Sequence, residues 1–502
     1  MNPRTTSRIL TGSPSRSGTS RSLAGAGLGL LAALFLAPLG CDSGGETGGG
    51  GSGASGGNGG SGANGGNGGS GASGAGTSAG GSGGDETGGG GGAGGDNTGG
   101  SGGNNTGGSG GNNTGGSGGG NPGGPAYPFP QASRPFGTRP SNHPQAALDD
   151  AVRSYYEYWK SAYVEPSNGT TPGGGYFVHM TGVGQGADES KTTSEAHGYG
   201  MIIFAIMAGH DPAAKEHFDG MYNMFDKHRS TLNDANMSWI ISNSESSSGD
   251  SDSATDGDMD VAYSLILADR QWGSGGDIDY LAQAKNTITQ GVKGGDMGPN
   301  KRPGLGDWDD DPWNTRASDW MTGHFRTYQE VTGDAYWGQV VTTLFSVASS
   351  LQQSHAPATG LLPDFVIGQT PQPAPFDYLG EGLVDFSWNA CRFPLRFALD
   401  HGLHGAPEPK NALAPVLSWI VAKTGNDPSK IKAGYFLNGD PQVNYSANAF
   451  TAPLVAAATT DPQYQSFLDK GWDEIVTHED DYYSDTITLL SMLHLSGNWW
   501  KP

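Results

Sequence analysis

The sequence predicts an all-α domain in which helices alternate with long loops, preceded by an export segment and a glycine-rich linker. Helical patterns dominate from about residue 145 onward, in about twelve segments, whereas strand patterns are short and scattered. The loops between the helices are rich in Gly, Asp, Trp and Pro. Helices that alternate with such loops indicate concentric helical rings, with the loops of one end forming a cleft where function is usually found.

The first 41 residues have the features of an export signal. Four arginines precede an apolar run, Leu23 to Leu39, which is too short for a comfortable membrane span. The small residue Gly40 before Cys41 resembles a bacterial lipobox, in which the cysteine is lipidated, although Pro38 stands where leucine is usual. We therefore expect an exported protein, at the bacterial cell surface through a lipid on Cys41, with cleavage and release as the alternative.

Residues 42–125 are almost wholly Gly, Ser, Asn and Thr and are predicted to be a disordered linker. Such side chains cannot build a core, so the entropy lost on ordering the backbone is not repaid. The linker is expected to act as a flexible tether. The folded domain then spans residues 126–502, which is enough chain to bury a large core.

The folded part is strongly acidic. The chain of 502 residues has a formal net charge of −23, and its first 125 residues hold only four basic and five acidic side chains. The acidity disfavours nucleic acid and anionic membranes as partners and suits a neutral or cationic ligand. Alternatively, it only keeps an exported protein soluble. Of the two cysteines, Cys41 belongs to the export segment, so Cys391 is expected to be a lone core thiol.

Twelve segments of the folded part carry helical signals. The first is amphipathic, the second follows a Thr/Ser cap, the third begins with Asp211-Pro212, and the fourth is apolar with small residues. The longest loops are 236–256, 296–316 and 356–386. The predicted helices are 147–163, 194–207, 212–228, 261–272, 277–293, 317–332, 335–354, 387–402, 409–424, 444–458, 461–475 and 481–496.

The helix predicted at 194–207 opens with an acidic residue, Glu195, in its first turn. Gly198 and Gly200 lie inside the same pattern, where each costs about 1 kcal/mol relative to alanine, so another part of the chain is expected to approach the backbone there. Glu195 is a candidate general acid, or only a favourable first-turn carboxylate. Because a helix N-terminus lowers a carboxyl pKa, a general acid here needs burial or a second carboxylate to raise it.

Three carboxylates within five residues, Asp256, Asp258 and Asp260, open the helix that ends at Trp272. They are either site residues or a cap with charges that complement the helix dipole. A calcium-binding loop is a weaker alternative, because the glycine at its sixth and the glutamate at its twelfth position are missing.

The segment 381–396 joins a loop with two carboxylates, Glu381 and Asp385, to a helix with two arginines. It could form a site or an arginine–carboxylate structural network. Aromatic residues gather near the three acidic segments, and flat rings beside acids suit the apolar faces of sugars, although a single tryptophan is more often a core residue. These aromatic residues are Trp239, Trp308, Trp313, Trp320, Trp337, Tyr378 and Trp388.

Other chemistries lack their motifs. The sequence has no His-Glu-x-x-His, no Cys-x-x-Cys and no phosphate-binding loop outside the low-complexity segment. We therefore expect neither a cofactor nor a metal ion.

Several of these segments together resemble glycoside hydrolase family 8. Residues 254–272, which begin Ala-Thr-Asp-Gly-Asp, resemble the family's signature, with Val261 where Ile or Met is usual. Residues 193–201 resemble its acid-bearing segment, and Ser-Gly-Asn-Trp-Trp at 496–500 is also similar. The resemblance covers about 145–502 and implies an (α/α)6 barrel that cuts β-1,4 linkages inside a polysaccharide with inversion.

The resemblance also implies roles for single residues. It places the general acid at Glu195 and makes Asp256 a carboxylate that holds the sugar next to the cut in a distorted shape. Arg392 resembles a cleft-facing residue that organises carboxylates. Trp239 and Trp320 lie in segments that resemble sugar-stacking loops. Two further rings complete the set of expected sugar contacts, namely Tyr378 and Trp388.

The general base is where this chain departs from the better-known branch of the family. That branch has an aspartate where this chain has Asn389, and an amide cannot take a proton from water. A second branch, which holds chitosanases and mixed-linkage glucanases, similarly has asparagine there and uses a glutamate from a preceding inserted loop. Glu381 fits that description, with Asp385 and Asp377 as alternatives.

The sequence leaves the substrate open. Chitosan, a polycation, is mildly favoured by the acidic surface and by the Asn389 and Glu381 arrangement. Mixed-linkage β-glucan and soluble cellulose derivatives are nearly as well supported, and xylan comes third. A monomeric enzyme is expected. The alternatives are a non-catalytic polysaccharide-binding protein on the same barrel and a structural surface protein.

Overall fold

The computed structural model describes residues 124–180, 190–242, 244–245 and 252–502. The predicted export segment, the lipidation site Cys41 and nearly all of the predicted linker lie outside these residues. They stay predictions, which mass spectrometry of the N-terminus of the exported protein would decide. Among the described residues, no helix is both long enough and apolar enough to cross a membrane.

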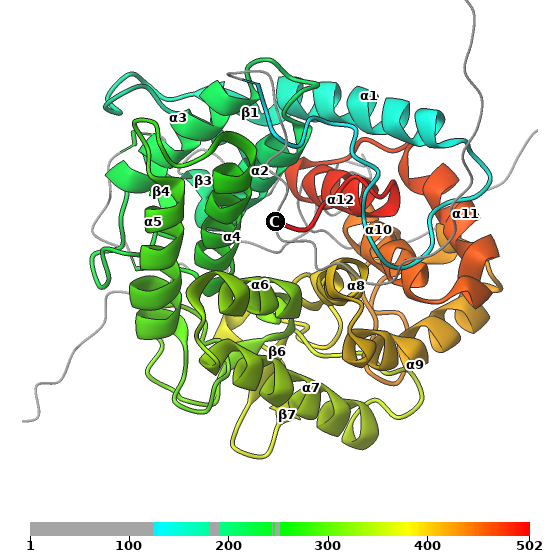
Figure 1. Cartoon of the computed structure of the whole chain (residues 1–502). Coiled ribbons are helices and arrows are strands. Elements are labelled where there is room, and N and C mark those ends of the chain that lie inside the picture. The colour runs from blue at the N-terminus through cyan, green and yellow to red at the C-terminus, as the bar shows by residue number, and fades with distance from the viewer. Residues whose placement is uncertain (1–123, 181–189, 243, 246–251) are drawn as a thin grey trace, which may run out of the picture. The chain divides into compact units, whose positions relative to one another are not determined.

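Two concentric rings of α-helices form the domain, which confirms the predicted (α/α)6 barrel (Figure 1). Each inner helix contacts the next inner helix around the ring, and each outer helix packs on an inner one. The inner helices are α2 (Ser194–Met207), α4 (Thr255–Trp272), α6 (Thr322–Thr332), α8 (Phe393–His404), α10 (Asn448–Ala457) and α12 (Tyr482–Leu495). The outer helices are α1 (Gln145–Tyr163), α3 (Ala214–Lys227), α5 (Tyr280–Asn286), α7 (Tyr336–Ser354), α9 (Pro407–Thr424) and α11 (Gln465–Ile475).

The hydrophobic pattern of a helix explains whether it lies in the inner or the outer ring. Every residue of α2 except Glu195 is buried, as expected for a helix surrounded by protein on all sides. The outer helix α1 instead buries one face, on which Val152, Tyr156 and Trp159 recur at helical spacing. Cys391, predicted to be a lone core thiol, is buried and free.

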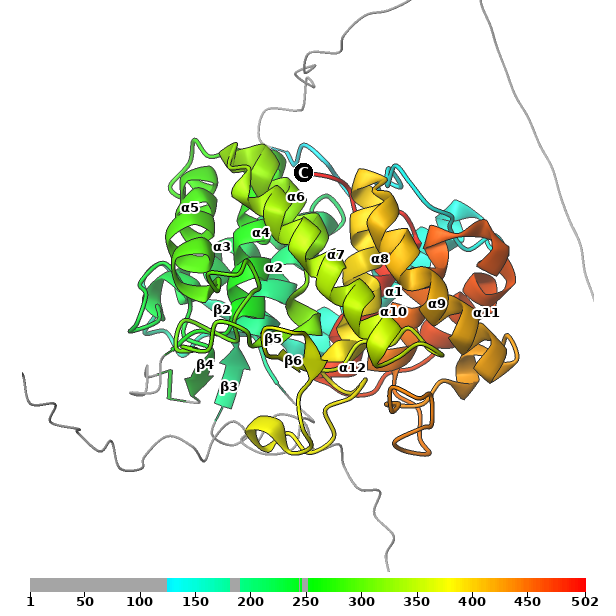
Figure 2. The ribbon, with the colours of Figure 1, turned by 90° about the horizontal axis from the view of Figure 1, so that it is seen from below.

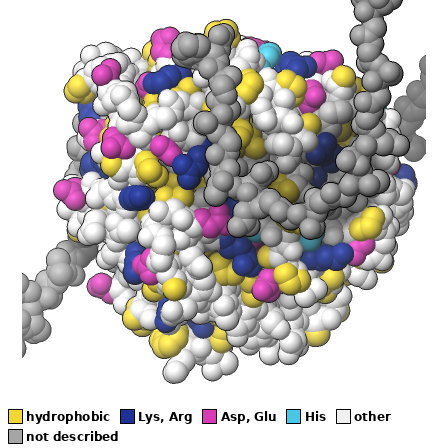
Figure 3. Space-filling view, viewed as in Figure 1, with side chains coloured by type: hydrophobic (Ala, Val, Ile, Leu, Met, Phe, Trp, Pro, Cys, Tyr) yellow, Lys and Arg dark blue, Asp and Glu magenta, His cyan; other side chains and the backbone are white. Residues whose placement is uncertain are grey.

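An N-terminal strap, residues 126–138, crosses one end of the barrel. Its backbone N–H groups donate to carbonyl oxygens at the C-terminal ends of five inner helices. The chain's C-terminus lies at the same end, opposite most of the strands (Figures 1 and 2). Seen from this end, acidic, basic and hydrophobic side chains are interspersed wherever described atoms are visible (Figure 3). The accepting residues are Gln271, Ala208, Gly497, Gly402 and Thr459.

Short antiparallel strands lie mainly at the other end, where the inner helices begin (Figure 2). The first two pairs are β1 (Val164–Pro166) with β2 (Tyr176–Val178) and β3 (Ser190–Thr193) with β4 (Ile240–Ser242). The third sheet joins β5 (Thr315–Arg316), β6 (Phe365–Ile367) and β7 (Gln372–Pro373). A small second core supports the loops around this sheet, made of Leu305, Phe365, Ala374 and Val384.

Helix ends are where the sequence predictions differ most from the structure. α4 begins at Thr255 rather than at 261, because its first two turns carry buried carboxylates that hide the apolar pattern. α8 begins at Phe393 rather than at 387, because Asp364 Oδ1 accepts the N–H groups of Ser387 and Ala390 and holds 387–392 in a turn. The predicted helix 277–293 is α5 followed by a π-helix over Thr287–Asp296.

Two buried carboxyls, Asp258 and Asp296, have no lysine, arginine or histidine partner among the described residues. Asp258 Oδ1 accepts the N–H of Met237 at 2.7 Å. Asp296 Oδ1 accepts from the Asn236 amide at 2.8 Å and the Ser253 hydroxyl at 3.1 Å. Within the described residues, the second oxygen of each carboxyl has no hydrogen-bond partner. Burial therefore raises the pKa of both carboxyls well above their ordinary value, and the neutral form is favoured.

Replacing Asp296 by Asn should make the protein less sensitive to high pH. Because folding raises the pKa of Asp296 above 3.8, its contribution to stability is full below that value and is lost as pH rises toward the raised pKa. The loss is at most about 1.4 kcal/mol per pH unit for one proton. Calorimetry from about pH 5 to about pH 9 should show a smaller fall in Tm for Asp296→Asn than for wild type. The exposed Asp310→Asn is the control, and parallel curves for wild type and Asp296→Asn would contradict the assignment.

Candidate active site

Helices α2 and α4 approach each other closely at the end of the barrel where the inner helices begin. A Cβ atom on Gly198 of α2 would lie 2.6 Å from Cβ of Asp260 on α4, and one on Gly257 of α4 would overlap Ser194. Only glycine permits these contacts. The close approach predicted for Gly198 is therefore confirmed, and it brings the first turns of the two helices together.

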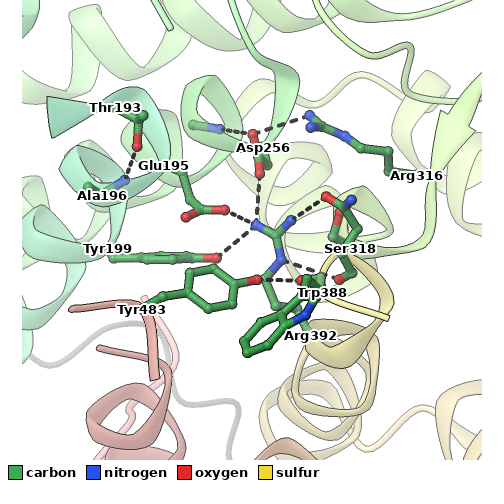
Figure 4. Close-up of polar contacts among 12 residues, drawn as sticks. Thr193, Glu195, Ala196, Tyr199, Asp256, Arg316, Ser318, Trp388, Arg392 and Tyr483 are labelled. Atoms are coloured by element: carbon green, nitrogen blue, oxygen red, sulfur yellow. Dashed lines mark hydrogen bonds and ion pairs between the residues drawn. The ribbon is translucent and has the colours of Figure 1, made fainter. Parts of the chain in front are cut away.

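Arg392 lies between the two first-turn carboxylates (Figure 4). Its Nη1 forms an ion pair with Oε2 of Glu195 and donates to Oδ2 of Asp256 at 2.8 Å and to the Tyr199 hydroxyl at 3.1 Å. Its Nη2 donates to Oδ1 of Asn389 at 3.1 Å. The Arg392 side chain is only 2% exposed, so this cation has almost no contact with solvent.

A second arginine, Arg316 on β5, also holds Asp256. Its Nη2 donates to Oδ1 of Asp256 at 3.3 Å, while its Nε donates to Asp319 at 3.0 Å. Burial acts to raise the pKa of Asp256, but Arg316 and Arg392 together lower it well below its ordinary value. Asp256 is therefore ionised.

Glu195 has the opposite electrostatics. Burial, together with the negative charge of Asp256, raises its pKa to about 7 against the pull of Arg392. The Tyr482 hydroxyl donates to its Oε1 at 3.3 Å. The side chain is 13% exposed, in a helix that is otherwise buried. Glu195 thus meets the condition that the sequence set for a general acid, since both burial and a second carboxylate raise its pKa.

Glu381 lies on the loop that follows β7, in a tightly wound turn. Leu379 and Gly382 have φ angles of 55° and 70°, and the N–H of Asp377 donates to the carbonyl of Gly382 at 2.8 Å. A leucine in the left-handed region costs roughly 1–2 kcal/mol. Such strained backbone gathers at functional sites.

The charges of the same two arginines act on Glu381 and on Glu195. Burial and the charge of nearby Asp364 raise the pKa of Glu381 to about 8, against the effect of Arg316 and Arg392. The same two arginines also lower the pKa of Glu195. The charges of the same two arginines therefore act on both glutamates, one from α2 and one from the loop after β7.

The alternative base residues have other surroundings. Asp385 Oδ2 accepts the N–H of Leu437 at 3.1 Å, so this carboxylate holds a neighbouring loop. Asp377 is exposed. Asn389 is buried, and its side-chain oxygen is occupied by Arg392.

The predicted aromatic contacts divide into two groups. The prediction that Trp320 stacks on a sugar is wrong. Its side chain is 0% exposed, and its Nε1 donates to Thr315 Oγ1 at 2.9 Å, so it is a core side chain without a free ring face. Trp337 is likewise buried, stacked on Phe325. The other predicted rings are half-buried, namely Trp239, Trp308, Trp313, Tyr378 and Trp388.

Trp239 lies next to the acid-bearing turn, because its carbonyl accepts the N–H of Ser194 at 2.9 Å. The carbonyl of Trp388 accepts the Tyr483 hydroxyl at 2.6 Å beside Arg392 (Figure 4). Tyr378 packs on the small second core under the Glu381 loop. Each of these three residues therefore belongs to a segment next to a residue of the site.

The three carboxylates that open α4 do not meet at one point. Asp260 receives Arg396 Nη1 at 2.9 Å and His324 Nε2 at 2.9 Å in the barrel core, whereas Asp258 faces Met237. Among the described residues, no group of three His, Cys, Asp or Glu side chains is placed to hold a metal ion. The arrangement gives no support to a calcium-binding loop.

Sequence reasoning missed several residues of the site. Tyr199 had a signal, since it follows Glu195 by one helical turn on the same face. Arg316, Asp364 and Tyr482 had none, because nothing in their local sequence relates them to Glu195 or Glu381.

A helical double ring that holds a protonated carboxyl beside an ionised one, with half-buried aromatic rings around them, defines a glycoside hydrolase. The chain belongs to the glycosyl hydrolases family 8, whose family model matches residues 145–497.

Individual relatives agree with this assignment. An endoglucanase of Bacillus sp. (strain KSM-330) is 41% identical over 381 residues, which cover 75% of this chain and 82% of the relative. A beta-glucanase of Niallia circulans is 40% identical over 387 residues, which cover 75% of this chain and 92% of the relative. The apo structure of a beta-1,3-1,4-glucanase from Paenibacillus sp. X4 matches with a TM-score of 0.71 and 38% identity, over 75% of this chain and 100% of that one.

Proposed function

We propose that this protein cuts internal β-1,4 linkages of a mixed-linkage or cellulose-type β-glucan in a single displacement that inverts the anomeric carbon. Glu195 is the general acid, Glu381 is the general base, and Asp256 holds the sugar next to the cut. The observation that carries the proposal is the shared Arg392, which contacts both carboxyl groups, while the pKa of Glu195 is raised and that of Asp256 is lowered.

The acid step uses the proton of Glu195. With a pKa of about 7, about half of this carboxyl is protonated at neutral pH, and the protonated form can donate to the glycosidic oxygen as the C–O bond breaks. The carboxylate that remains is stabilised by Arg392, already paired with it. The ionised Asp256 favours the positive charge that develops on the sugar ring.

The base step uses a water molecule on the opposite face of the sugar. Burial and nearby Asp364 leave only part of Glu381 ionised at neutral pH, and this ionised form takes a proton from the water as the water oxygen bonds to the anomeric carbon. Exchange with solvent then restores both glutamates. Inverting enzymes separate their two carboxyl groups by about 6.5–9.5 Å to admit this water. Glu195 has Arg392 and Tyr482 as its side-chain partners and no hydrogen bond to Glu381, as a separation that admits a water molecule requires.

Similarity to named relatives supports a β-glucan substrate. The relatives at 41% and 40% identity are named an endoglucanase and a beta-glucanase, and the structure at 38% identity is a beta-1,3-1,4-glucanase. The preference for chitosan that the sequence favoured is not supported by these relatives. Its physical basis was also weak, since an acidic surface accommodates a neutral polymer as well.

Replacing Glu195 by Gln should lower kcat on β-glucan by roughly 10²–10⁴-fold, because the amide keeps the shape but has no proton to give. Release of reducing sugar from barley β-glucan measures the loss. Glu216→Gln is the matched control, since Glu216 is also a first-turn acid but lies exposed on the outer helix α3. Unchanged activity in Glu195→Gln would rule out its role as the acid.

Proton NMR of fresh product should show the α-anomer first. Single displacement at a β-linked sugar inverts the configuration, whereas a covalent intermediate on the enzyme would retain it. The spectrum is recorded within the first minutes, before mutarotation mixes the anomers. A product that starts as the β-anomer would contradict the pairing of Glu195 with Glu381 across a water molecule.

A substrate panel should show hydrolysis of lichenan and carboxymethylcellulose well above that of xylan and chitosan. Half-buried rings such as Trp239 and Trp388 suit neutral glucan chains. Faster cleavage of chitosan would overturn the substrate proposal. Binding to the panel without any hydrolysis would instead favour a non-catalytic polysaccharide-binding protein.

A further inference from the structure

A buried carboxyl that the proposed reaction does not use lies between the base-bearing loop and the arginine pair. Asp364, just before β6, is 2% exposed. It forms no ion pair with a described residue, although the charge of Arg392 reaches it. Its bonds instead join three segments of the chain, each of which leads to one residue of the site.

The backbone of Asp364 forms the first two connections. Its carbonyl accepts the N–H of Ala317 at 3.2 Å, directly after Arg316 on β5. Its own N–H points to the carbonyls of Val384 and Asp385, at 2.9 and 2.7 Å, and so closes the neck of the loop that carries Glu381.

The side chain of Asp364 forms the third connection. Its Oδ1 accepts the N–H of Ser387 at 3.0 Å and the N–H of Ala390 at 2.6 Å. This holds the turn that ends at Arg392. Arg316, Glu381 and Arg392 are thus fixed relative to one another through one residue.

We propose that Asp364 is a positioning residue of this active site, which holds the Glu381 loop in place relative to Arg316 and Arg392 and acts on the reaction through Glu381. The inference rests on the proposed role of Glu381 as the general base. In this proposal Asp364 contacts neither the sugar nor the attacking water molecule.

The charge effect follows from the neighbours of Glu381. Burial raises the pKa of Asp364 to about 7, and the backbone N–H groups it accepts lower it. When Asp364 is ionised, its charge raises the pKa of Glu381 and disfavours the ionised form that acts as the base. When Asp364 is neutral, Arg316 and Arg392 favour ionised Glu381. The charged groups that act directly on Glu381 are Arg316 on β5, Asp364 before β6 and Arg392 before α8.

The test is the pH profile of kcat/KM on barley β-glucan for the full chain carrying Asp364→Asn. Asparagine keeps an oxygen for the two N–H groups but removes the charge, so the acidic limb should move to lower pH by roughly one unit. The exposed Asp440→Asn is the control and should leave the profile unchanged. A pH profile of Asp364→Asn that superimposes on that of wild type would show that Asp364 only caps the turn, and would overturn the proposal.

Asp364→Ser provides a second neutral variant if the asparagine fails to fold, since its hydroxyl can still accept a backbone N–H. Azide distinguishes a general base from a positioning residue, because it attacks the anomeric carbon without a general base. Azide should therefore restore the activity of Glu381→Ala, with formation of an α-glycosyl azide. It should not restore the activity of Asp364→Asn. Rescue of Asp364→Asn would make Asp364 the base and overturn the inference. Wild-type activity in Glu381→Ala would instead refute the proposed function, whatever Asp364→Asn does.

Discussion

The buried guanidinium of Arg392 is the interaction on which the active site depends. An arginine this deeply buried requires negative charge beside it, which Asp256 on α4 supplies, and Glu195 on α2 contacts the same guanidinium. Arg316 supplies a second positive charge on Asp256, so that this carboxyl holds its charge and leaves the proton to Glu195. One ionised and one protonated carboxyl side by side are the starting condition for glycoside cleavage.

The two ends of the barrel differ in what they hold together. At one end, the N-terminal strap ties the C-terminal ends of five inner helices through backbone hydrogen bonds. At the other end, the same helices begin, and the glycines at 198 and 257 let two of them approach closely enough to bring Glu195 and Asp256 to one cation. The loop that carries Glu381 packs on its own small core and is joined at its neck to Asp364 by backbone hydrogen bonds.

Predictions from the sequence succeeded where the signal was local and repeated. Helical periodicity found the helices of both rings, and the unfavourable glycine at 198 indicated a close contact with another part of the chain. Prediction was wrong for Trp320, because a buried and an exposed tryptophan in a polar loop look the same in sequence. It was silent on Arg316 and Asp364, whose partners are distant in the chain.

The sequence by itself determined the helical class of the fold, the acidic segments and the resemblance to a family of glycosidases, because these depend on residue types at fixed spacings. Only the tertiary structure decided which carboxyl keeps a proton, which rings reach the surface and which residues join the Glu381 loop to the arginines. The physical reason is that burial and Coulomb energy depend on distances between atoms, and residues such as Glu195, Asp256 and Arg392 come together only in the folded chain.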